Sequence, residues 1–145
     1  MVDIENIAQG GVMAPWQAHL VQEELRRSMG LNGGDHVVIG VSHVGVLNSW
    51  LGWEGTRPRI VAKSGPDGAD LALLEVLATE QVAARYDEVV LASGDGIFTE
   101  AVTALQAAGT VVTVVAWMNH CAKRLRLAAY RTTLLASETR LAGAA

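Results

Sequence analysis

Apolar positions along the chain follow two alternating spacings. Short runs rich in β-branched residues predict buried strands over residues 36–41, 59–62, 88–92 and 111–116. Between and around these runs, apolar residues recur every three or four positions, which is typical of helices. Helices are expected over residues 15–30, 44–51, 70–82, 97–107 and 121–130. The chain is therefore predicted to repeat a strand–helix unit.

This alternation predicts the fold class. Strands that read as continuous apolar runs belong to sheets covered on both faces, and parallel neighbours need a crossover as long as a helix. We expect a three-layer α/β/α sandwich with a central, mainly parallel sheet. At 145 residues, half of them apolar, with no repeat or long linker, the chain suits a single domain over residues 1–145.

The composition and the first residues of the chain bear on its cellular location. Cys121 is the one cysteine, so an internal disulfide is impossible and a reducing, cytoplasmic location is favoured. The start, MVDIEN, carries two acids where a signal peptide has a basic residue and an apolar run. No apolar run reaches the roughly 20 residues that span a bilayer, so no membrane association is expected.

Charge is segregated along the chain. The net charge of the whole chain is −4. The segment from Ala116 onward contains five basic residues and one acidic residue, a net charge of +4, so the rest of the chain carries −8. The basic residues are Lys123, Arg124, Arg126, Arg131 and Arg140, and the acid is Glu138. This region is either a contact for a nucleic-acid backbone or a solvated helix face.

Three acids stand where a parallel sheet binds ligands. Asp95 follows the strand at 88–92, Asp3 lies in a short apolar start, and Asp70 opens a predicted helix. If the first strand lies beside the 88–92 strand, Asp3 and Asp95 are neighbours where strand order reverses, and Asp70 could close a triangle. Taken singly, each acid has a simpler explanation: Asp95 as a helix N-cap, Asp70 as a complement to the helix dipole, Asp3 as a solvated residue.

Clustered acids call for a cation. Two carboxylates about 4 Å apart repel by about 4 kcal/mol at an effective dielectric constant near 20, so they need a proton or a metal. Mg²⁺ or Mn²⁺ suits carboxylate oxygens, whereas one cysteine and four scattered histidines provide no zinc spacing. A hard divalent ion held by acids in such a cleft indicates chemistry on phosphates.

Four segments resemble the NYN domain family, the PIN-like metal-dependent ribonucleases. VDIEN at 2–6 is similar to the family's D-x-x-N opening, and KSGPDGADLAL at 63–73 to its K-x-x-D-x-x-L region with an expanded turn. Residues 89–116 resemble its strand ending in S-G-D-x-D-F, with the helix, turn and strand that follow. CAKRLRLAAY at 121–130 looks like its basic last helix.

The resemblance implies a PIN-like sandwich that hydrolyses RNA with water activated on acid-bound Mg²⁺ or Mn²⁺. Carried over by motif, Asp3, Asn6, Asp70 and Asp95 form the catalytic site, with the three aspartates as metal ligands. Asn6 would orient a ligand carboxylate or a water, or it is simply a turn former.

Substrate contacts are expected around these acids. Ser93 and Thr99 would hydrogen-bond a phosphate oxygen or a metal-bound water, unless their hydroxyls bond the local backbone. Lys63, Lys123 and Arg124 would hold the RNA backbone. The tryptophans of NSWLGWEG, Trp50 and Trp53, would stack on bases, although core or dimer packing is the commoner use of such a pair.

Two departures from the family pattern bear on activity. Ile97 stands where S-G-D-x-D-F has its second aspartate, so one acid is missing, and Glu100 is the nearby acid that could replace it. MVDI leaves almost no first strand, so we expect either a very short strand or a chain that begins upstream of Met1.

Two other functions remain open from the sequence. One is a degenerate PIN-like module that binds RNA or a protein partner without cutting, which Ile97 favours. The other is a haloacid-dehalogenase-like phosphatase, because SGDGIF is also similar to that family's late G-D motif and Asp3 could be its nucleophile. DIEN lacks the second aspartate and the threonine expected after such a nucleophile. An acidic PIN-like chain would also gain from a homodimer or a partner that supplies basic surface.

Overall fold

The computed structural model describes residues 1–136, so Glu138 and Arg140 of the basic region lie outside the described residues. Each helix and strand is bounded as follows: β1 Val2–Asp3, α1 Ile4–Ala8, α2 Pro15–Met29, β2 Val38–Ser42, α3 Val46–Gly52, β3 Arg59–Lys63, α4 Gly68–Thr79, α5 Val82–Arg85, β4 Glu88–Ala92, α6 Thr99–Ala107, β5 Val111–Trp117, α7 Lys123–Ala128 and β6 Arg131–Leu135. Single 3₁₀ turns, His43–Gly45 and Gly96–Phe98, precede α3 and α6.

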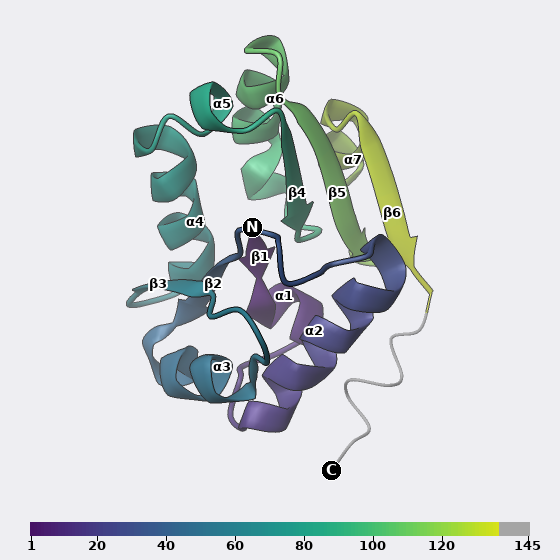
Figure 1. Cartoon of the computed structure of the whole chain (residues 1–145). Helices are drawn as coiled ribbons and strands as arrows, with labels where there is room; N and C mark the ends of the chain where they lie inside the picture. Colours follow the sequence, from purple (N-terminus) through teal and green to yellow (C-terminus); the bar gives the residue numbers. More distant parts are fainter. Residues whose placement is uncertain (137–145) are drawn as a thin grey trace.

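The strands form one six-stranded sheet in the order β3-β2-β1-β4-β5-β6, and every neighbouring pair is parallel (Figure 1). Strand order reverses between β1 and β4, which is the place where parallel sheets of this kind bind ligands beyond the carboxyl ends of their strands. The predicted parallel sheet, and the predicted neighbourhood of the first strand and the 88–92 strand, are confirmed.

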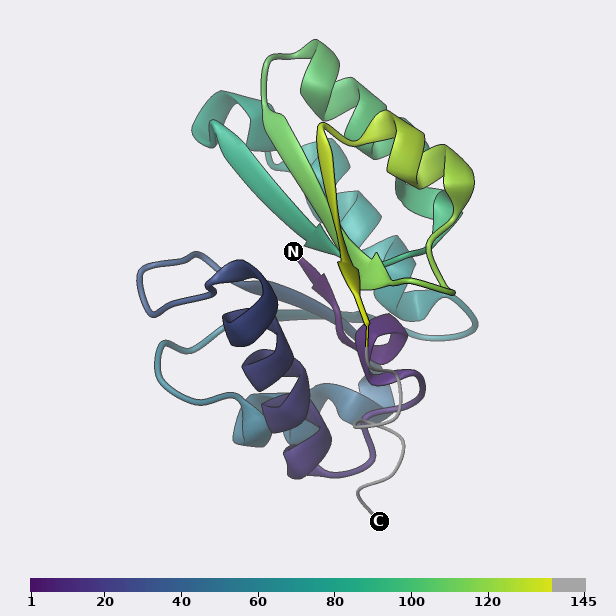
Figure 2. The same cartoon turned by 90° about the vertical axis from the view of Figure 1, so that its right-hand side faces the viewer.

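Helices cover both faces of the sheet (Figure 2). On one face α1 and α2 close a core with Trp53, and on the other α4, α6 and α7 close a second core. Ile4, Val21 and Trp117 are fully buried in the first core, and Leu73 and Phe98 in the second. The three-layer α/β/α arrangement expected from the sequence is therefore the observed one. Among residues 1–136, no helix is long and apolar enough to cross a membrane.

The first strand has two residues. Val2 pairs with Ile39 of β2 and with Ala92 of β4, and Asp3 pairs with Gly40. Ahead of Val2 the neighbouring strands enclose a cleft of about 820 Å³, and the Met1 ammonium group donates a hydrogen bond to the Val90 carbonyl oxygen at 2.9 Å. Burial lowers the pKa of this ammonium group to about 6.

Three short elements were not predicted from the sequence: α1, α5 and β6. Helices of four or five residues are too short to show a 3.6-residue period, and the RTTLL segment of β6 continues directly from a helical pattern. The helix expected at 121–130 therefore ends earlier, at Ala128. The helix expected at 70–82 begins earlier, at Gly68, where a Cβ atom would lie 2.2 Å from the Lys63 carbonyl oxygen.

Candidate functional site

Asp3 lies at the carboxyl end of β1 and is 3% exposed. The chain turns straight from β1 into α1, so Asp3 is also the N-cap of α1, and its Oδ1 accepts a hydrogen bond from the Asn6 backbone N–H at 3.2 Å. Its Oδ2 accepts a second bond, from the Ser93 hydroxyl at 2.8 Å. Donors from both sides of the β1–β4 junction therefore fix this carboxylate in one orientation.

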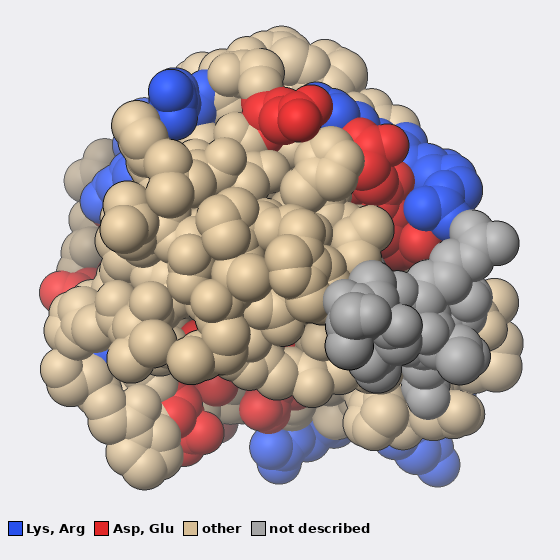
Figure 3. All heavy atoms as spheres, turned by 90° about the horizontal axis from the view of Figure 1, so that it is seen from below, with Lys and Arg blue, Asp and Glu red and all other residues tan. Residues whose placement is uncertain are grey.

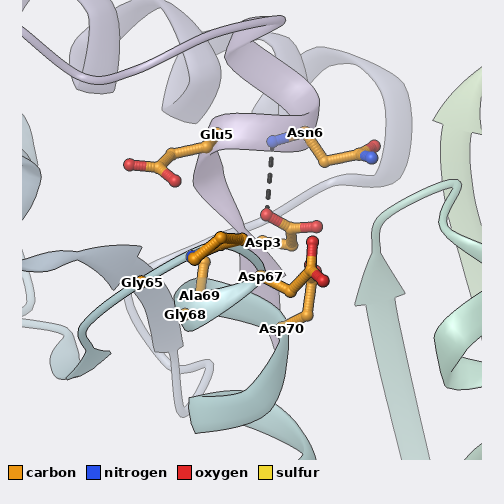
Figure 4. A pocket seen from close by; sticks show the side chains of 9 residues that line it. Asp3, Glu5, Asn6, Gly65, Asp67, Gly68, Ala69 and Asp70 are labelled. Carbon is orange, nitrogen blue, oxygen red and sulfur yellow. Dashed lines mark hydrogen bonds between the residues drawn. The ribbon is translucent and has the colours of Figure 1, made fainter.

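Asp70 meets Asp3 from the first turn of α4. The side chain of Asp70 is 8% exposed, and its carboxyl group hydrogen-bonds that of Asp3, toward which it points (Figure 4). Burial, together with the hydrogen bond and the charge of Asp3, raises the pKa of Asp70 to about 8. The raised pKa favours a proton on Asp70 at neutral pH, and this proton is donated to the Asp3 carboxylate.

The pKa of Asp3 responds to opposing influences. Burial raises it above the ordinary value for a carboxyl group, while hydrogen bonds from Asp70, Ser93 and the Asn6 backbone lower it. The negative charge of Glu5 raises it. The hydrogen bonds to Asp3 thus stabilise its ionised form against the effect of burial.

Asn6 connects this pair to the loop after β4. Its side-chain Oδ1 accepts a hydrogen bond from the Gly94 N–H at 3.0 Å. Gly94 packs so tightly against the His120 carbonyl group that no side chain fits there, and its own carbonyl oxygen accepts from the Ala122 N–H at 2.9 Å. The amide of Asn6 therefore has a positioning contact, which holds the Ser93–Asp95 loop against β1.

Asp95 lies at the rim rather than inside the acidic pair. It is exposed, and its Oδ1 accepts a hydrogen bond from the Ile97 N–H at 2.9 Å, which caps the 3₁₀ turn. Its charge still raises the pKa of Asp70, so the two carboxylates are electrostatic neighbours. The structure thus joins Asp3 and Asp70 and places Asp95 nearby, in the capping role that the sequence left open for it.

The acids border a pocket of about 300 Å³ (Figure 4). Besides Asp3, Asn6 and Asp70, it is lined by Glu5 and by the β3–α4 turn. Glu5 accepts hydrogen bonds from the Ser42 N–H and hydroxyl, at 3.2 and 2.5 Å. Asp67 of the turn has φ of 58°, in the left-handed region, and its charge also raises the pKa of Asp70.

Glu5 and Asp67 were missed from the sequence. Glu5 lies inside the D-x-x-N motif, one residue before Asn6, and Asp67 lies one helical turn before Asp70. Their closeness to predicted site residues was the available signal. Glu100, the predicted substitute for the missing acid, is exposed on the first turn of α6 and does not line the pocket.

The predicted substrate contacts are two hydroxyl groups and three basic side chains. Ser93 is fully buried and Thr99 donates to the Gly96 carbonyl oxygen at 2.7 Å, so both hydroxyls serve the protein itself. Lys63 forms an ion pair with Glu75 at 2.5 Å. Lys123 is exposed at the start of α7, and the Arg124 guanidinium packs on Gly96, where a Cβ atom would lie 2.5 Å from Nε. Arg124 is therefore the basic residue placed beside the Asp95 loop.

The donor set can be tested against a metal. Among the described residues, no three His, Cys, Asp or Glu side chains converge as a ready-made metal site. Asp3 and Asp70 do converge, and Mg²⁺ needs only one or two protein carboxylates because it retains several waters. A divalent ion in place of the shared proton would neutralise both acids, so the pair fits Mg²⁺ or Mn²⁺. Asp95 would join by leaving the Ile97 N–H.

Comparison with known proteins identifies the fold and the family. A solved structure of a protein of unknown function from Vibrio parahaemolyticus has the same fold: it is 18% identical, the alignment covers 94% of this chain and 90% of that one, and the TM-score is 0.53. No curated protein matches the chain. The family model of the NYN domain matches residues 55–136, which include Asp70, Asp95 and Arg124. Because this match spans more than half of the 145 residues, the chain belongs to the NYN domain family and has its nuclease-like fold.

Proposed function

We propose that this protein is a ribonuclease that hydrolyses RNA phosphodiester bonds with Mg²⁺ or Mn²⁺ held by Asp3 and Asp70. One observation carries the proposal: two acids that are both more than nine-tenths buried hydrogen-bond each other where strand order reverses. Burial opposes the second ionisation of such a pair, and a bound cation would offset that cost by replacing the proton. A pocket built in this way favours a cation.

The bound ion would supply an activated water and charge neutralisation at the phosphate. Ser93 and the Asn6 backbone hold the Asp3 carboxylate ready for it, so no reorientation is needed on binding. Asp95, exposed at the rim, is placed to orient a water once its side chain leaves the Ile97 N–H. Asn6 keeps the loop that carries Asp95 in contact with β1.

RNA would approach along α7. The acids around the pocket repel a phosphate backbone, so binding needs cations at the rim. Arg124 lies on Gly96 beside Asp95, and Lys123 is exposed one residue earlier. Lys63 contributes after it leaves Glu75. These contacts are independent of base sequence and sensitive to salt. The single cysteine, half-buried and unpaired, suits work in a reducing cytoplasm.

A second candidate is a module of the same fold that binds RNA or a protein partner without cutting. The observation that favours it is Ile97, which packs against the second core where the family motif has an acid. The third acid, Asp95, meanwhile caps a turn. Metal binding separates the two functions, because the module has no need of it.

The test is calorimetric titration of Mn²⁺ together with cleavage of a labelled single-stranded RNA. The wild type is expected to bind Mn²⁺ and cut, and Asp70→Asn is expected to lose both. Asp87→Asn is the matched control, because Asp87 is exposed at the amino end of β4, away from the pocket. A wild type that binds RNA but neither binds Mn²⁺ nor cuts would favour the non-catalytic module.

A further inference from the structure

Large apolar side chains are exposed together at the end of the molecule that carries α3 and the start of α2. Their exposed fractions run from 42 to 69%. We call this set the apolar face, and it consists of Met13, Trp16, Val44, Leu47, Trp50 and Leu51. A contiguous exposed apolar surface of this kind is often an interaction site.

The two segments that form the face are packed on one another. The Asn48 side-chain amide donates to the Val12 carbonyl oxygen at 3.1 Å, beside Met13. At Gly52 a Cβ atom would lie 1.9 Å from the Pro15 carbonyl oxygen, so α3 touches the first turn of α2, beside Trp16. The two segments that carry the face are therefore held together, and α3 and the start of α2 lie side by side at the lower end of Figure 1.

Charge is excluded from the middle of this end. Seen from below, a broad area without acidic or basic side chains is bordered by charged ones (Figure 3). Arg57 stacks on the Trp50 ring, with its guanidinium carbon 3.8 Å from the ring centroid. An apolar centre with a charged rim is the composition of a protein interface, whereas an RNA surface needs many cations.

We propose that the apolar face is the interface of a homodimer. At about 100 Å² for each exposed side chain, the six residues offer about 600 Å² per copy. A stable interface buries about 800 Å² per partner, so the six residues would provide about three quarters of it. The same face on each copy gives the two-fold, isologous contact that most homodimers use.

The charge distribution favours a second copy as the occupant. The chain carries a net charge of −4, so two copies repel one another on average. The apolar face is the part of the surface where self-contact escapes like-charge repulsion. Trp16 and Trp50, each 42% exposed, provide the aromatic anchors that dominate interface energy.

Sedimentation of the full chain tests the proposal. The wild type is expected to show twice the monomer mass of 15.3 kDa at about 100 µM, and Leu47→Glu is expected to weaken association at least about 100-fold. Leu127→Glu is the control, since Leu127 is 72% exposed on α7, outside the face. It should remain dimeric. Circular dichroism and thermal unfolding would confirm that both variants are folded.

Tryptophan fluorescence gives a second measurement. Trp16 and Trp50 become shielded from acrylamide on dimerisation, whereas Trp53 and Trp117 are already buried. Quenching of the wild type should therefore fall as protein concentration rises, and quenching of Leu47→Glu should stay constant. A wild type that sediments at 15.3 kDa throughout, or a Leu47→Glu variant that dimerises as well as the wild type, would overturn the proposal.

Discussion

Asp70 donates a hydrogen bond to Asp3 between the first turn of α4 and the carboxyl end of β1. The bond exists because burial favours one proton on the pair, and it opposes removal of that proton at neutral pH. Fold stability and metal binding are both linked to this proton. Their dependence on pH can therefore be predicted.

Without metal, the wild type should lose stability relative to Asp70→Asn as pH rises from about 4 to about 8. The comparison is made between the two proteins because the lowered pKa of the Met1 ammonium group, present in both, acts in the opposite direction above about pH 6. The folded-state pKa of Asp70 is about 8 against 3.8 for the ordinary group, so the folded state binds more protons in this window. The stability linked to this proton is complete below about 4 and is lost above about 8. Allowing for solvent screening at the pocket, we expect a loss of about 2 kcal/mol. Urea unfolding at pH 5, 7 and 9 measures it.

Asp70→Asn should remove that dependence and be more stable than the wild type at pH 8 to 9. The asparagine amide can donate to Asp3 as the protonated carboxyl group does, without a charge to bury. Asp87→Asn should retain the wild-type slope, because Asp87 is exposed. Equal slopes in wild type and Asp70→Asn would show that the pair does not share a proton.

Mn²⁺ affinity of the wild type should rise as pH increases toward 8. The ion and the proton compete for the same oxygens, so affinity should gain up to about tenfold per pH unit below the pKa of Asp70. Calorimetry at pH 6, 7 and 8 measures this affinity. Repeating the titration in buffers of different ionisation enthalpy gives the number of protons released when Mn²⁺ binds. Binding that is independent of pH would place the ion away from Asp70.

The position of Asp3 beside the 88–92 strand followed from the sequence because topology follows from strand runs. Long apolar strands fixed a parallel sheet, and a parallel sheet brings the ends of neighbouring strands together, so Asp3 met the 88–92 strand as predicted. The direction in which Asp95 points did not follow. The hydrogen bond from the Ile97 N–H to Asp95 contributes about 1 kcal/mol. This free energy is too small for the sequence to show whether the Asp95 side chain caps the turn or points toward Asp70.

Glu5 and the proton on Asp70 were also beyond the sequence. Glu5 reaches the pocket because β1 ends after two residues and α1 begins at once, and no periodicity signals a five-residue helix. The proton depends on how completely α4 and β4 bury the pair, which is a property of packing. The sequence pattern therefore predicted which acids lie at the site but not which of them is protonated.

Asp95→Asn should lower RNA cleavage at least about 100-fold and leave the fold unchanged. Asparagine is as good a capping residue as aspartate, so its side chain can accept the same hydrogen bond from the Ile97 N–H. The free energy of unfolding should therefore change by less than about 0.5 kcal/mol. The variant loses a charge at the rim that would orient water. Single-turnover cleavage and thermal unfolding check both parts. Full activity would remove Asp95 from the site.

Ser93→Ala should destabilise the protein by about 2 kcal/mol and weaken Mn²⁺ binding. The Ser93 hydroxyl is fully buried and donates to Asp3, and hydrogen bonds to charged groups contribute about 1.5 to 3 kcal/mol. Its loss raises the pKa of Asp3 and misorients the carboxylate. Thr99→Ala is the control, because that hydroxyl bonds the Gly96 carbonyl instead. Equal Mn²⁺ affinity in Ser93→Ala and wild type would assign Ser93 to stability alone.

Lys123→Ala combined with Arg124→Ala should weaken RNA binding and flatten its salt dependence. Two lost phosphate contacts reduce the slope of log affinity against log salt by about 1.4 for a single strand. The control is Arg26→Ala with Arg27→Ala, which removes the same charge from α2, where both arginines pair with glutamates. Fluorescence anisotropy from 50 to 300 mM salt distinguishes a local contact from a general charge effect. If the salt dependence of RNA affinity falls equally in both double variants, α7 has no special part in binding, and RNA affinity depends on the net charge of the protein alone.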